Sequence, residues 1–115
     1  MNYDLEERTA KFGENVIHFI GSLPKNETNK ILINQVIRSA TSIGANYMEA
    51  NQASSKKDFR NKIGICRKEA NETKYWVRMI VSANKEKTDE CKKLWKESNE
   101  LMLIFSKIFS SSNKN

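Results

Sequence analysis

The amino-acid sequence predicts an all-α protein, an up-down-up-down antiparallel four-helix bundle. Apolar residues recur every three or four positions in four long segments, which is the period of an amphipathic helix. Short polar breaks separate these segments, so consecutive helices are expected to lie antiparallel to one another. Four glycines and one proline in 115 residues are also too few for the turns of a many-stranded β fold.

The first predicted helix begins after Asp4 and ends before Pro24. The segment Asp4-Leu5-Glu6-Glu7 is a capping-box pattern, in which the first carboxylate accepts from free backbone amides and Glu7 reaches back. Proline cannot continue a helix. The only histidine, His18, falls on the solvent-facing side. The apolar stripe consists of Leu5, Thr9, Phe12, Val16, Phe19 and Leu23.

The second predicted helix runs from about Thr28 to about Ala53. Its apolar stripe is made of Ile33, Val36, Ala40, Ile43, Tyr47 and Ala50. A second stripe, roughly opposite, has small and amide-bearing residues in place of the usual Lys and Glu: Gln35, Arg38, Ser42, Asn46 and Glu49. A solvated face is the default interpretation of such a stripe. The alternative is a polar contact between helices or between subunits, where hydrogen bonds fix the register.

The third predicted helix starts at a capping pattern beginning with Ser55 and is close to thirty residues long. Its apolar stripe is made of Phe59, Ile63, Cys66, Ala70, Thr73, Val77 and Ile80. The segment Lys85–Asp89 forms the next polar break. Thr88 in this break is the predicted N-cap of the last helix.

The fourth predicted helix ends the domain. Its apolar side carries Leu94, Trp95, Ser98, Leu101, Met102, Phe105, Ile108 and Phe109. The run Leu101–Phe105 is apolar on nearly all sides, which suggests more buried surface than one bundle supplies and hence self-association. We therefore expect a single bundle domain over residues 1–110 and a flexible C-terminal tail over residues 111–115.

The positive charge of the chain is concentrated on the third helix. Eight basic and three acidic residues lie between positions 54 and 84, which is +5 of the total net charge of +6. At 100° per residue, five of the basic residues form one ridge about 33 Å long. They are Lys56, Arg60, Arg67, Lys74 and Arg78. Such a ridge matches a nucleic-acid backbone, which it binds by neutralising phosphates, although most charge runs are solvated helix faces.

The sequence favours a protein without enzymatic activity, metal or cofactor. His18 has no partner at a catalytic spacing, and neither a Glu-x-x-His pair nor a glycine-rich loop is present. Cys66 and Cys91 are 25 positions apart without a CxxC pattern, so we expect free buried thiols. The acidic start of the chain and the lack of a long apolar run predict a soluble, cytoplasmic protein.

Four segments of the sequence resemble the 23S ribosomal RNA intervening-sequence protein family of bacteria. They are Leu23–Lys25, Gln35–Ala50, Ser55–Phe59 and Lys68–Trp76. The most specific part is the pattern Arg-Ser-Ala-x-Ser-Ile-Gly-Ala-Asn-x-x-Glu-Ala, which begins at Arg38. The order and spacing of these segments extend over nearly the whole chain.

The resemblance implies a homopentamer of four-helix protomers. It also implies kinship with the accessory variability determinant proteins of diversity-generating retroelements, which are basic pentamers that bind nucleic acid and a reverse transcriptase. The polar residues of the second helix become motif or interface positions by this resemblance. The basic ridge is not part of the motif. We therefore expect a homo-oligomer that binds RNA or DNA through the ridge, and the alternative is a scaffold that docks an acidic protein such as a reverse transcriptase.

Overall fold

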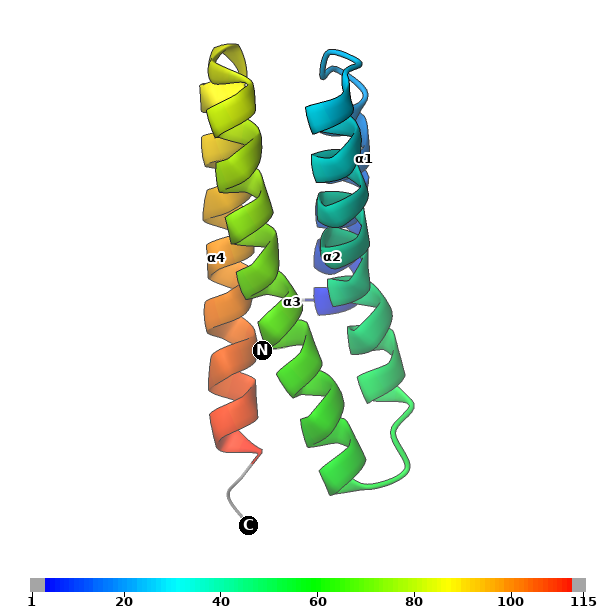
Figure 1. Ribbon diagram of the computed structural model, residues 1–115. Coiled ribbons are helices and arrows are strands. Elements are labelled where there is room, and N and C mark those ends of the chain that lie inside the picture. The colour runs from blue at the N-terminus through cyan, green and yellow to red at the C-terminus, as the bar shows by residue number, and fades with distance from the viewer. Residues whose placement is uncertain (1–3, 113–115) are drawn as a thin grey trace.

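The computed structural model describes residues 4–112, which fold into a rod of 49 × 20 × 20 Å (Figure 1). Over these residues the chain forms four α-helices and one short 3-10 helix, so the predicted all-α antiparallel bundle is confirmed. The elements are α1 (Leu5–Ile20), α2 (Glu27–Asn51), α3 (Lys56–Ala83), η1 (Lys85–Lys87) and α4 (Thr88–Ser111).

The four helices form two antiparallel hairpins, and α2 and α3 join them. In Figure 1 α1 lies behind α2, and α4 lies behind α3. The α2–α3 and α3–α4 pairs approach closely along their length, whereas α1 and α4 approach each other sparsely. Arg8 of α1 spans this wider gap, because its guanidinium binds Glu97 at 2.8 Å and Glu100 at 2.9 Å on α4. The α3 helix is therefore the central element, packed between α2 and α4.

Side-chain caps begin the first three helices. Asp4 accepts from the amide of Glu7 at 3.1 Å, as the capping pattern predicts, and Asn26 accepts from the amide of Asn29 at 2.8 Å. The predicted cap at Ser55 is confirmed, since its hydroxyl accepts from the amide of Asp58 at 3.0 Å. Each cap satisfies a backbone donor that the helix leaves free.

The predicted N-cap at Thr88 is wrong. Thr88 is the first residue of α4, and its hydroxyl donates to the carbonyl of Lys85 at 2.6 Å. The chain continues from η1 into α4 without a residue in the extended conformation, so no side chain is placed to cap the helix. At the other end α4 continues through Ser111, and residues 113–115 of the predicted tail lie outside the described residues.

The predicted apolar stripes form the core, with one exception. The largest fully buried side chains include Phe12, Ile43, Ile63 and Phe105, one from each helix. Trp95 was expected in the core and is 42% exposed. Trp95 is at the edge of the α4 stripe. Its ring lies at the molecular surface, on the side of α4 that faces α3.

The apolar end of α4 is mostly covered by its own bundle. Leu101 and Phe105 are fully buried, Met102 and Ile104 are half-buried, and Leu103 is 55% exposed. Within this run, Leu103 is therefore the one side chain exposed for the predicted self-association. The first hairpin exposes more apolar side chains than this run does, Ile17, Ile31 and Met48.

A pair of buried asparagines closes one end of the bundle. The amide of Asn29 donates to Asn84 at 3.0 Å, and the amide of Asn84 donates back at 2.9 Å. Their remaining donors reach the carbonyls of Pro24 and Ile80. The pair ties the start of α2 to the end of α3, and the hydrophobic period did not predict it because both residues are polar.

Both cysteines are free thiols with no exposed surface, as predicted. Burial raises the pKa of Cys66 to about 12 and that of Cys91 to about 11. Between residues 4 and 112 no helix is long and apolar enough to cross a bilayer.

Candidate nucleic-acid interface

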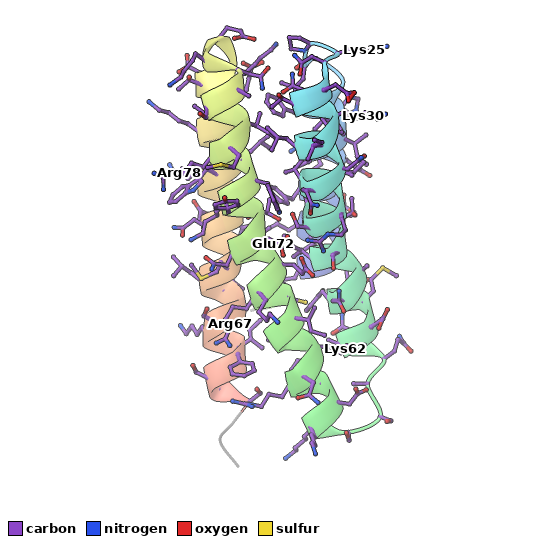
Figure 2. All side chains as sticks on the ribbon, viewed as in Figure 1. Lys25, Lys30, Lys62, Arg67, Glu72 and Arg78 are labelled. Carbon is purple, nitrogen blue, oxygen red and sulfur yellow. The ribbon has the colours of Figure 1, made fainter. Side chains whose placement is uncertain are left out.

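The charged side chains on the two edges of α3 have different kinds of partner. On the edge that faces α2, basic and acidic side chains pair across the helices. Arg38 of α2 binds Glu69 at 3.3 Å and also binds Glu72, while Lys62 of α3 binds Glu49 of α2 at 2.8 Å. Figure 2 shows Glu72 and Lys62 on this side of α3. The charge on this edge is therefore largely neutralised within the chain.

The polar stripe of α2 lies along this same edge. Gln35, Ser42 and Asn46 are half-buried. The amide of Asn46 donates to the carbonyl and to the hydroxyl of Ser42, both at 2.9 Å. With Arg38 and Glu49 paired to α3, four of the five residues of the stripe make polar contacts within the chain.

Glu72 is the centre of the paired edge. The indole of Trp76 donates to its carboxylate at 2.8 Å, and Arg38 binds it from α2. The Trp76 hydrogen bond and the Arg38 guanidinium hold the pKa of Glu72 below its usual value. Both contacts favour the charged carboxylate over the protonated one.

The opposite edge of α3 faces α4, and its cations lie over aromatic rings. The guanidinium carbon of Arg60 is 3.8 Å from the ring centroid of Phe109, and that of Arg67 is 4.1 Å from the same centroid. The ring lies over Gly64, where an added Cβ would stand 3.0 Å from Cε1 of Phe109. A glycine on α3 thus makes room for a ring flanked by arginines from the turns before and after it.

Lys74 continues this arrangement two turns further along α3. Its ammonium donates to the side-chain oxygen of Asn99 at 3.0 Å and lies 5.2 Å from the ring centroid of Trp95. Asn99 and Trp95 are both on α4. Lys74 is therefore held by a neutral amide and a ring rather than by a carboxylate.

Lys56 and Arg78 lie at the two ends of the row, and both are exposed. Figure 2 shows Arg67 and Arg78 on the α4 side of α3. Within residues 4–112, none of the five ridge residues forms an ion pair with a carboxylate. We call this surface the basic seam: Lys56, Arg60, Arg67, Lys74 and Arg78 of α3, with Trp95, Asn99 and Phe109 of α4.

The stacked arginines remain able to bind an anion. A guanidinium over a ring uses its flat face, whereas its N–H donors point outward in its own plane. The ring also restricts the side chain, which lowers the conformational entropy that binding would cost. The Nε of Arg60 is the exception, because it is buried without a hydrogen-bond partner among the described residues.

Sequence reasoning located the α3 half of the seam and missed the α4 half. Trp95 and Phe109 share the spacing of the apolar stripe, so the period alone assigned them to the core. No pattern in the sequence singled out Asn99. Gly64 was the one available clue, because it lies between Arg60 and Arg67 on the same helix face and leaves space for a side chain from α4.

The other candidates considered from the sequence do not converge on a site. His18 is exposed and lies beside Glu90 and Lys93 in a shallow depression between α1 and α4. The three carboxylates along the α2 edge each meet a cation: Glu69 and Glu72 bind Arg38, and Glu49 binds Lys62. In the described part of the chain no three His, Cys, Asp or Glu side chains are grouped so as to hold a metal ion.

Comparison with known proteins identifies the family. Residues 1–107 match the family described as 23S rRNA-intervening sequence protein. The fold is similar to a crystal structure from Bacteroides thetaiotaomicron VPI-5482, described as a protein with unknown function from the S23 ribosomal protein family. That likeness has a TM-score of 0.80 and 29% identity, and covers 90% of this chain and 96% of that chain. No curated protein matches the chain significantly. The resemblance noted in the motif segments is confirmed, and the chain belongs to the 23S rRNA-intervening sequence protein family.

Proposed function

We propose that this protein is a non-enzymatic, homo-oligomeric nucleic-acid-binding protein that holds phosphates with the basic seam. The observation that carries the proposal is the contrast between the two edges of α3. The α2 edge is paired with carboxylates, whereas the α4 edge keeps Arg60, Arg67 and Lys74 over rings and an amide. Solubility alone does not require that cations and carboxylates be separated between the two edges of one helix.

The length of the seam suits a nucleic-acid backbone better than a protein carboxylate surface. Guanidinium groups offer paired donors to phosphate as they do to carboxylate, so the chemistry of the cations permits either ligand. A row of cations about 33 Å long follows a continuous anionic chain. Contacts of this kind set affinity and orientation without reading sequence.

Self-association would multiply the seam, because linked copies of a weak site bind one long ligand with high avidity. It is supported by the outer face of the first hairpin, where Ile17, Ile31 and Met48 are exposed by 48%, 61% and 59%. Ile17 and Met48 border a groove between α1 and α2 that is lined with two carboxylates, Glu6 and Glu14, and with small residues, Thr9, Ala10, Gly13, Thr41, Gly44 and Ala45. The family resemblance suggests a pentamer, which light scattering of the purified protein would test; a stable monomer would remove this part of the proposal.

The binding proposal is tested by charge reversal at two positions of the seam. Arg67→Glu with Arg78→Glu lowers the net charge by four, and so does the control pair Lys25→Glu with Lys30→Glu. The control lysines are exposed on the first hairpin, away from the seam (Figure 2). We expect the seam variant to lose binding to RNA and DNA at about 50 mM salt, and the control to retain it. Equal binding by both variants, or no binding by the unmodified protein, would contradict the proposal.

A scaffold that docks an acidic protein, such as a reverse transcriptase, is the competing function. A capture experiment from lysate separates the two, because nuclease treatment destroys a nucleic-acid bridge and leaves a direct protein contact intact. A partner that survives nuclease and depends on Arg67 and Arg78 would favour the scaffold.

A further inference from the structure

Two exposed aromatic rings border the basic seam. Trp95 of α4 is 42% exposed and Tyr75 of α3 is 53% exposed. The other large apolar side chains exposed between residues 4 and 112 are aliphatic: Ile17, Ile31, Met48 and Leu103. Among the described residues, the exposed tryptophan and tyrosine rings therefore lie on α3 and α4, the two helices that form the seam.

One ring contacts a cation of the seam, and the other lies about one helical turn from a seam residue. The ammonium of Lys74 lies 5.2 Å from the ring centroid of Trp95. Tyr75 precedes Arg78 by three residues on α3, a spacing that places neighbours on one helix face. The Tyr75 ring also meets Trp76 edge-to-face, with centroids 5.0 Å apart and planes at 77°. This contact brings the Tyr75 ring toward the α2 side of α3, where Trp76 binds Glu72, and leaves more than half of the surface of Tyr75 exposed.

Rings placed among cations are a feature of sites for unpaired bases. A base has two flat faces that stack on an aromatic side chain, while the phosphates on either side meet the basic residues. In a duplex the bases already stack on one another, so a duplex offers the seam its phosphates alone. Binding a duplex would leave the exposed surfaces of Trp95 and Tyr75 uncovered.

We propose that the basic seam binds single-stranded nucleic acid, with unpaired bases stacked on Trp95 and Tyr75 and phosphates held by Arg67, Lys74 and Arg78. This inference rests on the proposed function and narrows it to one class of ligand. Asn99 adds a neutral amide at the edge of the Trp95 site, where its oxygen holds Lys74 at 3.0 Å. Lys74 is thus fixed beside the ring on which a base would stack.

Tryptophan fluorescence can report on binding at Trp95. Of its two tryptophans, Trp76 is half-buried on the α2 edge and donates to Glu72. In the full-length Trp76→Phe variant the remaining tryptophan fluorescence comes from Trp95. We expect quenching when a single strand of about 15 nucleotides is added, and none from an abasic strand with the same number of phosphates. RNA and DNA strands are both titrated, and the strand with the higher affinity identifies which nucleic acid is the ligand.

Binding measurements on ring variants complete the test. Trp95→Leu and Tyr75→Leu are each expected to weaken single-strand binding by roughly 5- to 100-fold while leaving duplex binding unchanged. Trp95→Phe retains a stacking face and is expected to restore most of the affinity. The control Asn34→Leu places a leucine at an exposed site on α2, outside the seam, and is expected to change neither. Melting curves check that each variant remains folded.

The outcomes separate this inference from the proposed function. If the leucine variants bind single strands as the unmodified protein does, or lose single-strand and duplex binding equally, stacking is wrong. The seam would then still bind phosphates, provided that reversal of Arg67 and Arg78 abolishes binding. If the unmodified protein binds neither single strands nor duplex, both are wrong.

Discussion

The guanidinium of Arg67 lies 4.1 Å from the ring centroid of Phe109, although the two residues are 42 positions apart and belong to different helices. The contact joins the middle of α3 to the end of α4, and Arg60 meets the same ring at 3.8 Å. It shows how the protein keeps two like charges close together without a carboxylate between them. The electron-rich faces of the ring offset part of their repulsion.

Replacing Phe109 with leucine is expected to weaken both stability and binding without changing any charge. The loss of two cation–π contacts should cost about 1–2 kcal/mol of unfolding free energy. The arginines lose the surface that restricts them, so nucleic-acid affinity should fall by roughly 3- to 10-fold. Urea denaturation and fluorescence anisotropy measure the two effects. Undiminished affinity in a folded variant would show that the ring does not order the arginines.

Replacing Asn84 with leucine is expected to cost about 1–3 kcal/mol, because the buried amide of Asn29 loses its reciprocal partner. Replacing both asparagines should cost less than the sum of the two single changes. A double-mutant cycle by urea denaturation measures this coupling. Single effects that add to within about 0.5 kcal/mol would mean that the pair does not act as a unit.

The lowered pKa of Glu72 makes part of the stability acid-sensitive. A carboxyl group with a lowered pKa in the folded state stabilises the fold above its unfolded pKa, and this contribution is lost as the pH falls through the folded pKa. The effect should appear below the ordinary value of 4.5 and amount to about 0.5 kcal/mol, because the carboxylate is partly exposed.

Trp76→Phe removes the larger cause of this shift, so the variant should lose less stability between pH 5 and pH 3 (about the range in which carboxyls titrate) than the unmodified protein. Thermal melting across this range measures the difference. Glu86→Gln, at an exposed site on η1, serves as the control. Identical acid profiles of the Trp76→Phe variant and the unmodified protein would disprove the assignment.

The two thiols should react only when the chain opens. Burial raises the pKa of Cys66 to about 12 and that of Cys91 to about 11, and neither residue has exposed surface. The reactive thiolate is thus scarce and covered. Mass spectrometry after treatment with a thiol reagent should find native protein unlabelled while the urea-denatured chain labels twice. Rapid labelling of native protein at neutral pH would contradict the packing around these residues.

The sequence predicts the fold well because most local signals agree with the global one. Ser55 caps α3 as expected, since capping depends on four consecutive residues. The core residues Phe12, Ile43 and Ile63 follow from the helical period alone. Thr88 was misassigned because the 3-10 turn before it removes the extended residue that a cap requires.

The site is less accessible to such reasoning. The cations of α3 share one helix, so their alignment follows from 100° per residue. Their partners on α4 depend on which residues of two helices come to the same level, and the period contains no such information. Trp95 shows the difference, because it satisfies the apolar spacing and yet lies at the surface beside Lys74.

The dependence of affinity on salt tests the central claim most directly. The three phosphate contacts assigned to a single strand, at Arg67, Lys74 and Arg78, predict that log affinity falls against log salt with a slope of roughly −2.1, at about 0.7 per contact. Arg67→Gln with Arg78→Gln should flatten the slope by about 1.4, whereas Lys25→Gln with Lys30→Gln should leave it unchanged. A slope near zero, or the same flattening in both variants, would contradict the assignment of phosphate binding to the basic seam.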